Sequence, residues 1–121
     1  AVTVAVRRLH EAGATVVVGT DAGVNPGKPH DVLPHAVHEL TSIGVDGPGV
    51  LTALTATAAE ACGVGSRKGR LAPGYDADMI TVDADPVRDP AALLDVRQVW
   101  RCGRLVVGDG DASSEGLQPL C

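Results

Sequence analysis

The sequence has no phenylalanine, one tryptophan, one tyrosine and one methionine among its 121 residues. Its core must therefore use mainly alanine, valine and leucine, which suits helices packed closely on a sheet. Arg7-Arg8 and His10-Glu11 interrupt the apolar first twenty residues, so these form neither a membrane span nor a signal segment. Basic residues are scattered in short pairs and the formal net charge is −5, so we expect no nucleic-acid partner.

The cysteines, at positions 62, 102 and 121, form neither a CxxC pair nor an even-numbered framework. Their number and spacing favour a reducing, cytoplasmic setting over a disulfide scaffold. They also lack the neighbouring histidine or clustered arginine that favours a reactive thiolate, which argues against cysteine catalysis. The glycines of GTDAG around Asp21 form no phosphate loop, because no Lys-Ser/Thr pair stands at the required spacing.

The first half of the sequence has an α/β pattern. Apolar residues at helical spacing predict helices over residues 2–12, 32–43 and 49–62. Gly13 ends the first helix, and the second has Asp31 as N-cap and Pro34 in its first turn. Residues 14–19, ATVVVG, are an unbroken apolar run typical of a strand buried on both faces in a parallel sheet. Because the sequence begins at Ala1 within a helical pattern, we expect a truncated chain.

The pattern changes near residue 65, where short apolar stretches begin to alternate with turn residues. They predict strands within residues 70–74, 77–86, 98–103 and 104–110, with a short helical or irregular link over 91–96. Alternation of Met79 and Thr81 with Ile80 and Val82 predicts that residues 78–83 bury one face. We therefore divide the chain into an α/β part over 1–64, a β-rich part over 65–108 and a loose tail over 109–121.

Asp21 directly follows the predicted strand 14–19. In α/β barrels the loops after the carboxyl ends of the strands build the active site. A carboxylate there could bind a metal ion or act as a general base, since both roles need a fixed oxygen in a partly dry site. It could equally cap the following turn, which aspartate does well, and the residues alone leave both roles open.

Three histidines follow Asp21, at positions 30, 35 and 38. Neutral imidazoles are common metal ligands, and two at i and i+3 on a helix can share a metal. His35 and His38 lie away from the apolar stripe of their predicted helix, so we interpret them as surface residues. His30 lies in the loop after Asp21 and could contact a substrate in the same cleft, whereas we interpret His10 as structural or exposed.

The segments GTDAG, LTALTATAAEACG and GRLAPGYDAD, in this order and spacing, resemble the carboxyl-terminal part of the amidohydrolase superfamily. The similar branch is the one that includes imidazolonepropionases and amidohydrolase-type prolidases. The resemblance covers about residues 8–108 and includes a G-x-L-x-x-G-x-x-A-D pattern from Gly69 to Asp78. It implies an α/β fold: the last βα unit or units of a TIM-type barrel, then strands of a small β-sandwich, together an incomplete domain.

The resemblance also implies a chemistry. The family hydrolyses C–N bonds of small amide, cyclic amide or dipeptide substrates with water activated by a divalent metal such as zinc. By position, Asp21 is the catalytic aspartate, which carries a proton from this water to the leaving nitrogen and also coordinates the metal; His30 is the candidate substrate-binding residue. A catalytic metal needs three or more protein ligands. The family's HxH motif is missing from this sequence, so we expect the chain alone to be inactive.

Two other interpretations remain open. The chain could be a non-catalytic α+β interaction or oligomerisation module, or a decayed fragment, that has kept the family's carboxyl end. It could also be a small metal-binding protein that uses His30, His35 and His38. In every case a strand over 14–19 needs neighbours on both edges. We therefore expect isolated material to be unstable or self-associated, for example as a homo-oligomer.

Overall fold

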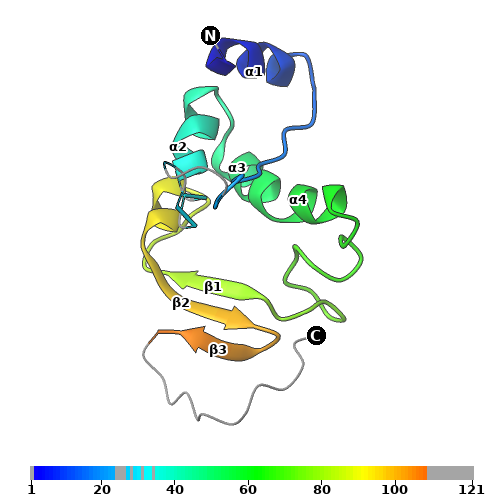
Figure 1. Cartoon of the computed structure of the whole chain (residues 1–121), viewed down its shortest axis with the longest axis vertical. Coiled ribbons are helices and arrows are strands. Elements are labelled where there is room, and N and C mark those ends of the chain that lie inside the picture. The colour runs from blue at the N-terminus through cyan, green and yellow to red at the C-terminus, as the bar shows by residue number, and fades with distance from the viewer. Residues whose placement is uncertain (1, 24–26, 28, 31, 34, 109–121) are drawn as a thin grey trace.

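The computed structural model describes residues 2–23, 27, 29–30, 32–33 and 35–108. Its elements are α1 (Val2–Glu11), α2 (His35–Ser42), α3 (Gly47–Leu54), α4 (Ala56–Ala61), β1 (Met79–Val82), the 3-10 helix η1 (Pro90–Leu94), β2 (Val96–Arg101) and β3 (Arg104–Val107). Figure 1 shows the sheet at one end, α2, α3 and α4 in the middle, and α1 at the other end. The predicted tail over 109–121, and the predicted helix-capping residues Asp31 and Pro34, lie outside the described residues.

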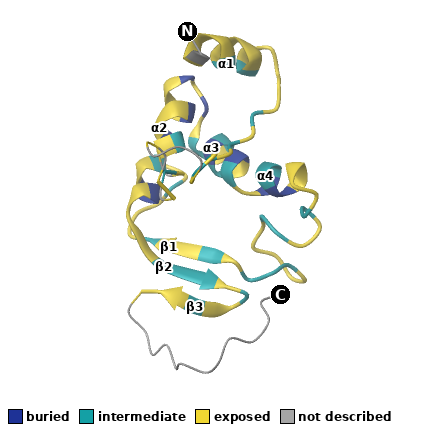
Figure 2. Cartoon of the chain, viewed as in Figure 1, coloured by how far each residue is buried: buried dark blue, intermediate teal, exposed yellow. Residues whose placement is uncertain are grey.

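The apolar core lies between α2, α3 and η1. Val50 of α3 is completely buried, and Leu40 of α2 and Leu93 of η1 lie in the same cluster. Val16 and Val18 pack against this cluster from the segment that follows α1. Figure 2 shows buried positions in the helical part, whereas the described strands are half-buried or exposed. The helical part therefore provides the hydrophobic stabilisation of the described chain.

The predicted helix over 49–62 is two helices in the structure. Asp46 caps α3, because its Oδ1 accepts a hydrogen bond of 2.9 Å from the Gly49 amide. The break falls at Thr55, whose φ of −123° and ψ of −88° are not helical. The Thr55 hydroxyl donates to the Leu51 carbonyl, the type of back-bonding that bends helices. The helical spacing predicted from the sequence is correct, but the break at the β-branched residue Thr55 was not predicted.

The start of α2 also differs from the prediction, since it begins at His35 rather than at residue 32. Val32 and Leu33 form turns instead, whose carbonyls accept hydrogen bonds from the amides of His35 and Ala36. A proline at 34 disfavours helical backbone at the residue before it, which explains the later start. The prediction for α1 is confirmed, and Gly13, with φ of 83°, ends it as expected.

The predicted strand over residues 14–19 is not formed among the described residues, so the prediction is wrong for these 121 residues taken alone. Ladder hydrogen bonds need a second strand alongside, and among the described residues β1, β2 and β3 pair with one another and not with this segment. The segment nevertheless alternates: Val16, Val18 and Thr20 are half-buried, while Val17 and Asp21 on the other face are exposed. One face lies on the helices and the other is bare, so the expectation of burial on both faces also fails.

The β-rich part forms an antiparallel sheet in the order β1-β2-β3. β2 and β3 form a hairpin whose turn residues, Cys102 and Gly103, both have positive φ, as two-residue hairpin turns require. The strands predicted within 98–103 and 104–110 are confirmed over the described residues, and the link predicted over 91–96 as helical or irregular contains the 3-10 helix η1, whereas residues 70–74 form no strand. A register shift between Thr81 and Val82 replaces the predicted alternation along β1.

A cluster of charges ties the loop before the sheet to the hairpin. Lys68 Nζ lies 2.7 Å from Asp76 and 2.5 Å from Asp78, and Asp78 Oδ1 accepts a hydrogen bond of 2.8 Å from the Cys102 amide. The hydrogen bond from Lys68 lowers the pKa of both carboxyls, and the same two carboxylates raise the pKa of Lys68. This Lys68 cluster holds the segment that precedes β1 in place.

Two further expectations can be compared with the described residues. Cys62 is an exposed free thiol, but Cys102 is disulfide-bonded, so the expectation of reduced cysteines is wrong at that position. An odd number of cysteines argues only weakly against a single bond. In the part of the chain that the structure describes, no helix is long and apolar enough to cross a membrane.

Candidate functional site

Asp21 lies where the extended segment 14–20 turns. Its side chain is exposed on the same face as Val17, and its φ of 51° is in the left-handed region. The Ala22 amide donates a hydrogen bond of 3.2 Å to Thr20 Oγ1, which closes a tight turn around Asp21. The carboxylate therefore stands on the bare face of the segment, away from the core.

His30 lies against this turn. A Cβ built on Gly23 would come within 3.1 Å of His30 Cε1 and 3.5 Å of His30 Nε2, so the imidazole lies directly over the glycine backbone. Gly23 also has φ of 84°, a conformation that disfavours any side chain. One candidate residue of the sequence analysis, His30, thus lies against the turn that contains the other, Asp21.

A hollow of about 210 Å³ lies beside the turn. The segment Val18–Thr20 forms one wall, and Val32, Leu33 and the first half of α2 form the other. His35 and Glu39 of α2 border it, and both are exposed, as the sequence predicted for a surface histidine. Thr20 and Gly23 were not predicted from the sequence. The alternation along residues 14–20 could have indicated Thr20, and the position of a glycine soon after Asp21 could have indicated Gly23.

The described residues do not fit a metal ion by themselves. Among them, no group of three His, Cys, Asp or Glu side chains is placed to hold one. His30, His35 and His38 are all described, so they do not assemble a metal site, and the small metal-binding interpretation is overturned. One carboxylate and one imidazole on the 20–23 turn are fewer than the three protein ligands that a catalytic zinc requires.

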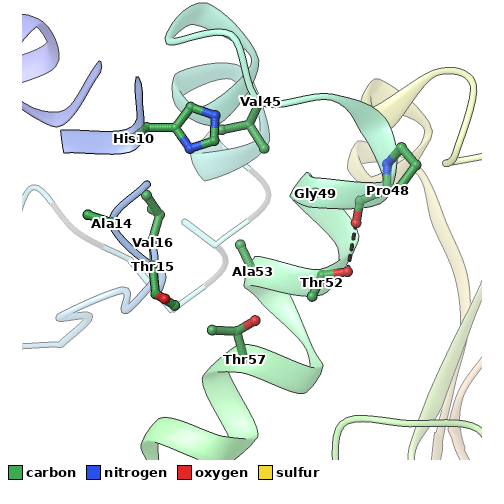
Figure 3. A pocket seen from close by; sticks show the side chains of 10 residues that line it. All are labelled: His10, Ala14, Thr15, Val16, Val45, Pro48, Gly49, Thr52, Ala53 and Thr57. Carbon is green, nitrogen blue, oxygen red and sulfur yellow. Dashed lines mark hydrogen bonds between the residues drawn. The ribbon is translucent and has the colours of Figure 1, made fainter. Parts of the chain in front are cut away.

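A second hollow, of about 320 Å³, lies beside the first residues of the segment, Ala14 to Val16, and contains neither candidate residue. Figure 3 shows it between residues 14–16 and α3, with the His10 imidazole at one end. The Thr52 hydroxyl donates to the Pro48 carbonyl at 2.8 Å, so it is engaged within its own helix. This hollow is mainly apolar, and its lining contains the single imidazole of His10 but no carboxylate to pair with it.

Comparison with solved structures identifies the fold. The chain superimposes on a Xaa-Pro dipeptidase crystallised with methionine in its active site, with a TM-score of 0.79 and 25% identity over 88% of this chain and 25% of that one. A suggested prolidase from Bifidobacterium longum gives a TM-score of 0.76 and 31% identity over 86% of this chain and 26% of that one. The described elements are thus a portion of an amidohydrolase fold.

The family follows from the sequence match. Residues 2–107 match the Amidohydrolase family, and the chain belongs to that family. It is 41% identical over 105 residues to an imidazolonepropionase from Deinococcus deserti, which covers 83% of this chain and 26% of that protein. The chain therefore spans about a quarter of the length of the relatives it matches.

Proposed function

We propose that these residues are the carboxyl-terminal part of a metal-dependent hydrolase that cleaves C–N bonds in small amide-type substrates. Family membership over residues 2–107 supports this class of reaction. The observation that carries the proposal is the contact of the His30 imidazole with Gly23, two residues after Asp21. That contact brings a carboxylate and an imidazole, the usual acid–base groups of hydrolysis, to one exposed turn.

In this proposal Asp21 carries the proton. Its carboxylate accepts a proton from the attacking water and returns it to the nitrogen of the leaving group as the C–N bond breaks. His30, whose ring lies over the same turn, contacts the substrate. Amidohydrolases in general depend on a divalent metal, and we propose zinc, with Asp21 as one ligand and the others supplied by residues beyond these 121.

The full protein would also complete the fold. We propose that residues 14–19 pair as a strand in the last βα unit of a TIM-type barrel, with β1, β2 and β3 in a β-sandwich. The exposure pattern supports this, since the face with Val17 and Asp21 is bare while Val16 and Val18 lie on the helices. Barrel strands have one face on the helices and one toward the axis, where catalytic groups gather at the carboxyl end.

The names of the relatives suggest two substrate classes: an imidazolone and an Xaa-Pro dipeptide. We therefore propose as probes imidazolone propionate and methionyl-proline, assayed with the full-length gene product and added zinc. Asp21→Asn keeps the size of the side chain but removes its basicity. It should reduce kcat by about 10²–10⁴-fold, the usual contribution of a positioned acid–base group.

Glu39→Gln is the matched control for this experiment. Glu39 is an exposed carboxylate that borders the neighbouring hollow on α2, outside the 20–23 turn. We expect this variant to keep activity within about twofold, because exposed substitutions away from the chemistry have small effects. Equal activity of wild type and Asp21→Asn on a probe that the wild type cleaves would overturn the proposed role.

A non-catalytic interaction module is the second candidate, and the apolar surface favours it. Leu71 is 76% exposed and Val107 59% exposed, and a hollow of about 370 Å³ opens between α3 and β1. The coding sequence before Ala1 separates the candidates. An HxH motif roughly two to three hundred residues upstream, the size of a barrel, favours the enzyme. A start codon close to Ala1 favours the module.

A further inference from the structure

The backbone at Asp21 has a conformation that residues with a Cβ disfavour. Its φ of 51° places it in the left-handed region, which aspartate enters more readily than most residues but still at a cost. Such conformations persist only where the surroundings hold them, and they concentrate at functional sites. A group near Asp21 must therefore hold its backbone in the left-handed conformation.

Thr20 makes one contact that can hold the Asp21 backbone. Its Oγ1 accepts the hydrogen bond of 3.2 Å from the Ala22 amide, and this bond spans the Asp21 backbone. Thr20 is itself half-buried on the face that Val16 and Val18 turn to the helices, and it borders the hollow beside α2. One end of the bond is therefore anchored on the packed side of the segment, while Asp21 stands on the exposed side.

We propose that Thr20 is a positioning residue for the Asp21 carboxylate. Its hydroxyl fixes the turn, so that Asp21 remains in the left-handed region with its side chain on the bare face. The proposal rests on the proposed function of Asp21 and adds a residue that acts through it. The acceptor oxygen is the essential feature, because valine has nearly the same shape as threonine but cannot accept the Ala22 hydrogen bond.

The test uses the full-length gene product with methionyl-proline and imidazolone propionate as probes and zinc added. Thr20→Val should lower kcat by about 10–100-fold, since a small displacement of a catalytic group has effects of this size. KM should change by less than about threefold, because uniform substrate binding is retained. Thr20→Ser keeps the acceptor oxygen and should restore kcat to within about threefold of wild type.

Thr41→Val is the matched control. Thr41 is an exposed residue of α2, and its hydroxyl donates to the Val37 carbonyl at 2.8 Å within that helix. This variant makes the same chemical change as Thr20→Val at a site that does not touch the turn. It should leave both kcat and KM unchanged, which separates a general loss of packing from an effect on Asp21.

Hydrogen exchange at the Ala22 amide gives a readout that needs no activity. Loss of the acceptor should speed exchange at Ala22 by about tenfold or more in Thr20→Val, and Thr20→Ser should exchange as wild type does. Unchanged exchange in Thr20→Val would overturn the hydrogen bond. Equal losses of kcat in Thr20→Val and Thr20→Ser would overturn the role of the hydroxyl.

Asp21→Asn, measured in the same series, keeps the two proposals apart. If it is inactive while Thr20→Val is fully active, the role of Thr20 is overturned and the proposed function stands. If Asp21→Asn is as active as wild type, the proposed function fails, and Thr20 then has no carboxylate to position. The exchange rate at Ala22 would still report whether Thr20 holds the turn.

Discussion

The strands of the sheet within residues 79–107 and the extended segment of residues 14–20 have different outcomes. Both are rich in valine, yet β1, β2 and β3 pair fully with one another, while residues 14–20 have no strand partner among the described residues. The sheet is antiparallel, β2 and β3 are joined by a two-residue turn, and β1 precedes β2 by a link that contains η1, so each strand has its neighbour next along the chain. A strand of a parallel sheet must receive its neighbours from distant parts of a chain.

The difference teaches that composition fixes the preference for extended backbone, whereas the presence of partners decides whether a strand forms. Residues 14–20 keep the alternation of a strand without its ladder, because Val16 and Val18 still have helices to pack against. The exposed half of that alternation carries Asp21. The exposed face of this segment is thus the part that carries the proposed chemistry.

The largest expected change in the free energy of unfolding distinguishes the apolar core from the exposed face of residues 14–20. Leu40 is 4% exposed within the core cluster, so Leu40→Ala in the 121-residue chain should lower the free energy of unfolding by about 2–5 kcal/mol. Val17 is 44% exposed on the bare face, and Val17→Ala should change the free energy of unfolding by less than about 0.5 kcal/mol. Urea denaturation followed by circular dichroism measures both.

The outcome for Val17→Ala also reports on self-association. A loss comparable to that of Leu40→Ala would mean that the bare face is covered in solution, as in a homo-oligomer. The wild-type transition would then move to higher urea as the protein concentration rises. Sedimentation at two protein concentrations distinguishes this case, since a monomer keeps one sedimentation coefficient.

The elements that could be predicted from the sequence are those whose determinants are local. Apolar spacing located α1, and alternation with turn residues located β2 and β3 to within a few residues. The failures have non-local or competing causes. The strand over 14–19 lacked a partner, and Thr55 broke a helix that its apolar spacing favoured. Short-range patterns report propensity, and packing decides among the outcomes.

The candidate site was predicted in part. The position of Asp21 after an apolar run and the proximity of His30 in sequence pointed to one turn, and the contact of His30 with Gly23 agrees. The role of Thr20 could not be predicted, because it depends on a positive φ at Asp21 and on which face of the segment is buried. Neither property can be read from residue types alone.

A smaller change in stability is expected for substitutions at Gly69, where the loop before the sheet packs on the helices. A Cβ on Gly69 would lie 2.7 Å from the Ala59 Cβ and 2.8 Å from the Thr55 carbonyl oxygen, and its φ is 85°. Gly74 has the same φ of 85° but has open space around it. Both alanine variants carry the backbone strain, so Gly69→Ala should be less stable than Gly74→Ala by about 1–3 kcal/mol, the usual result of overpacking.

Thermal unfolding of the two glycine variants measures this difference directly. Because the strain at positive φ is shared, it cancels in the comparison, and the remaining difference reports the contact between residue 69 and α4. Equal melting temperatures would show that the loop around residue 69 moves away from α4 without loss of stability. The sheet would then be only loosely attached to the helical part.

The smallest expected effect concerns the Lys68 cluster, whose charges are half-buried at Lys68 and Asp76 and exposed at Asp78, so that water still weakens their attraction. The lowered pKa values of Asp76 and Asp78 mean that their contribution is present above their ordinary value of 3.8 and is lost as the pH falls through the lower, folded values. The raised pKa of Lys68 means that its contribution is present below 10.5 and is lost as the pH rises through the higher, folded value.

Lys68→Met tests this dependence, because it removes the cation and leaves two neighbouring carboxylates. The melting temperature of wild type should exceed that of the variant by a few degrees at most, with a constant difference between roughly pH 5 and pH 9. The difference should shrink outside those limits and in high salt, which screens exposed charges. Arg88→Met removes the cation of an exposed pair with Asp85 at 3.5 Å and serves as the matched control. A pH-independent difference for Lys68→Met would mean that the lysine stabilises the sheet part through its methylene chain rather than through its charge.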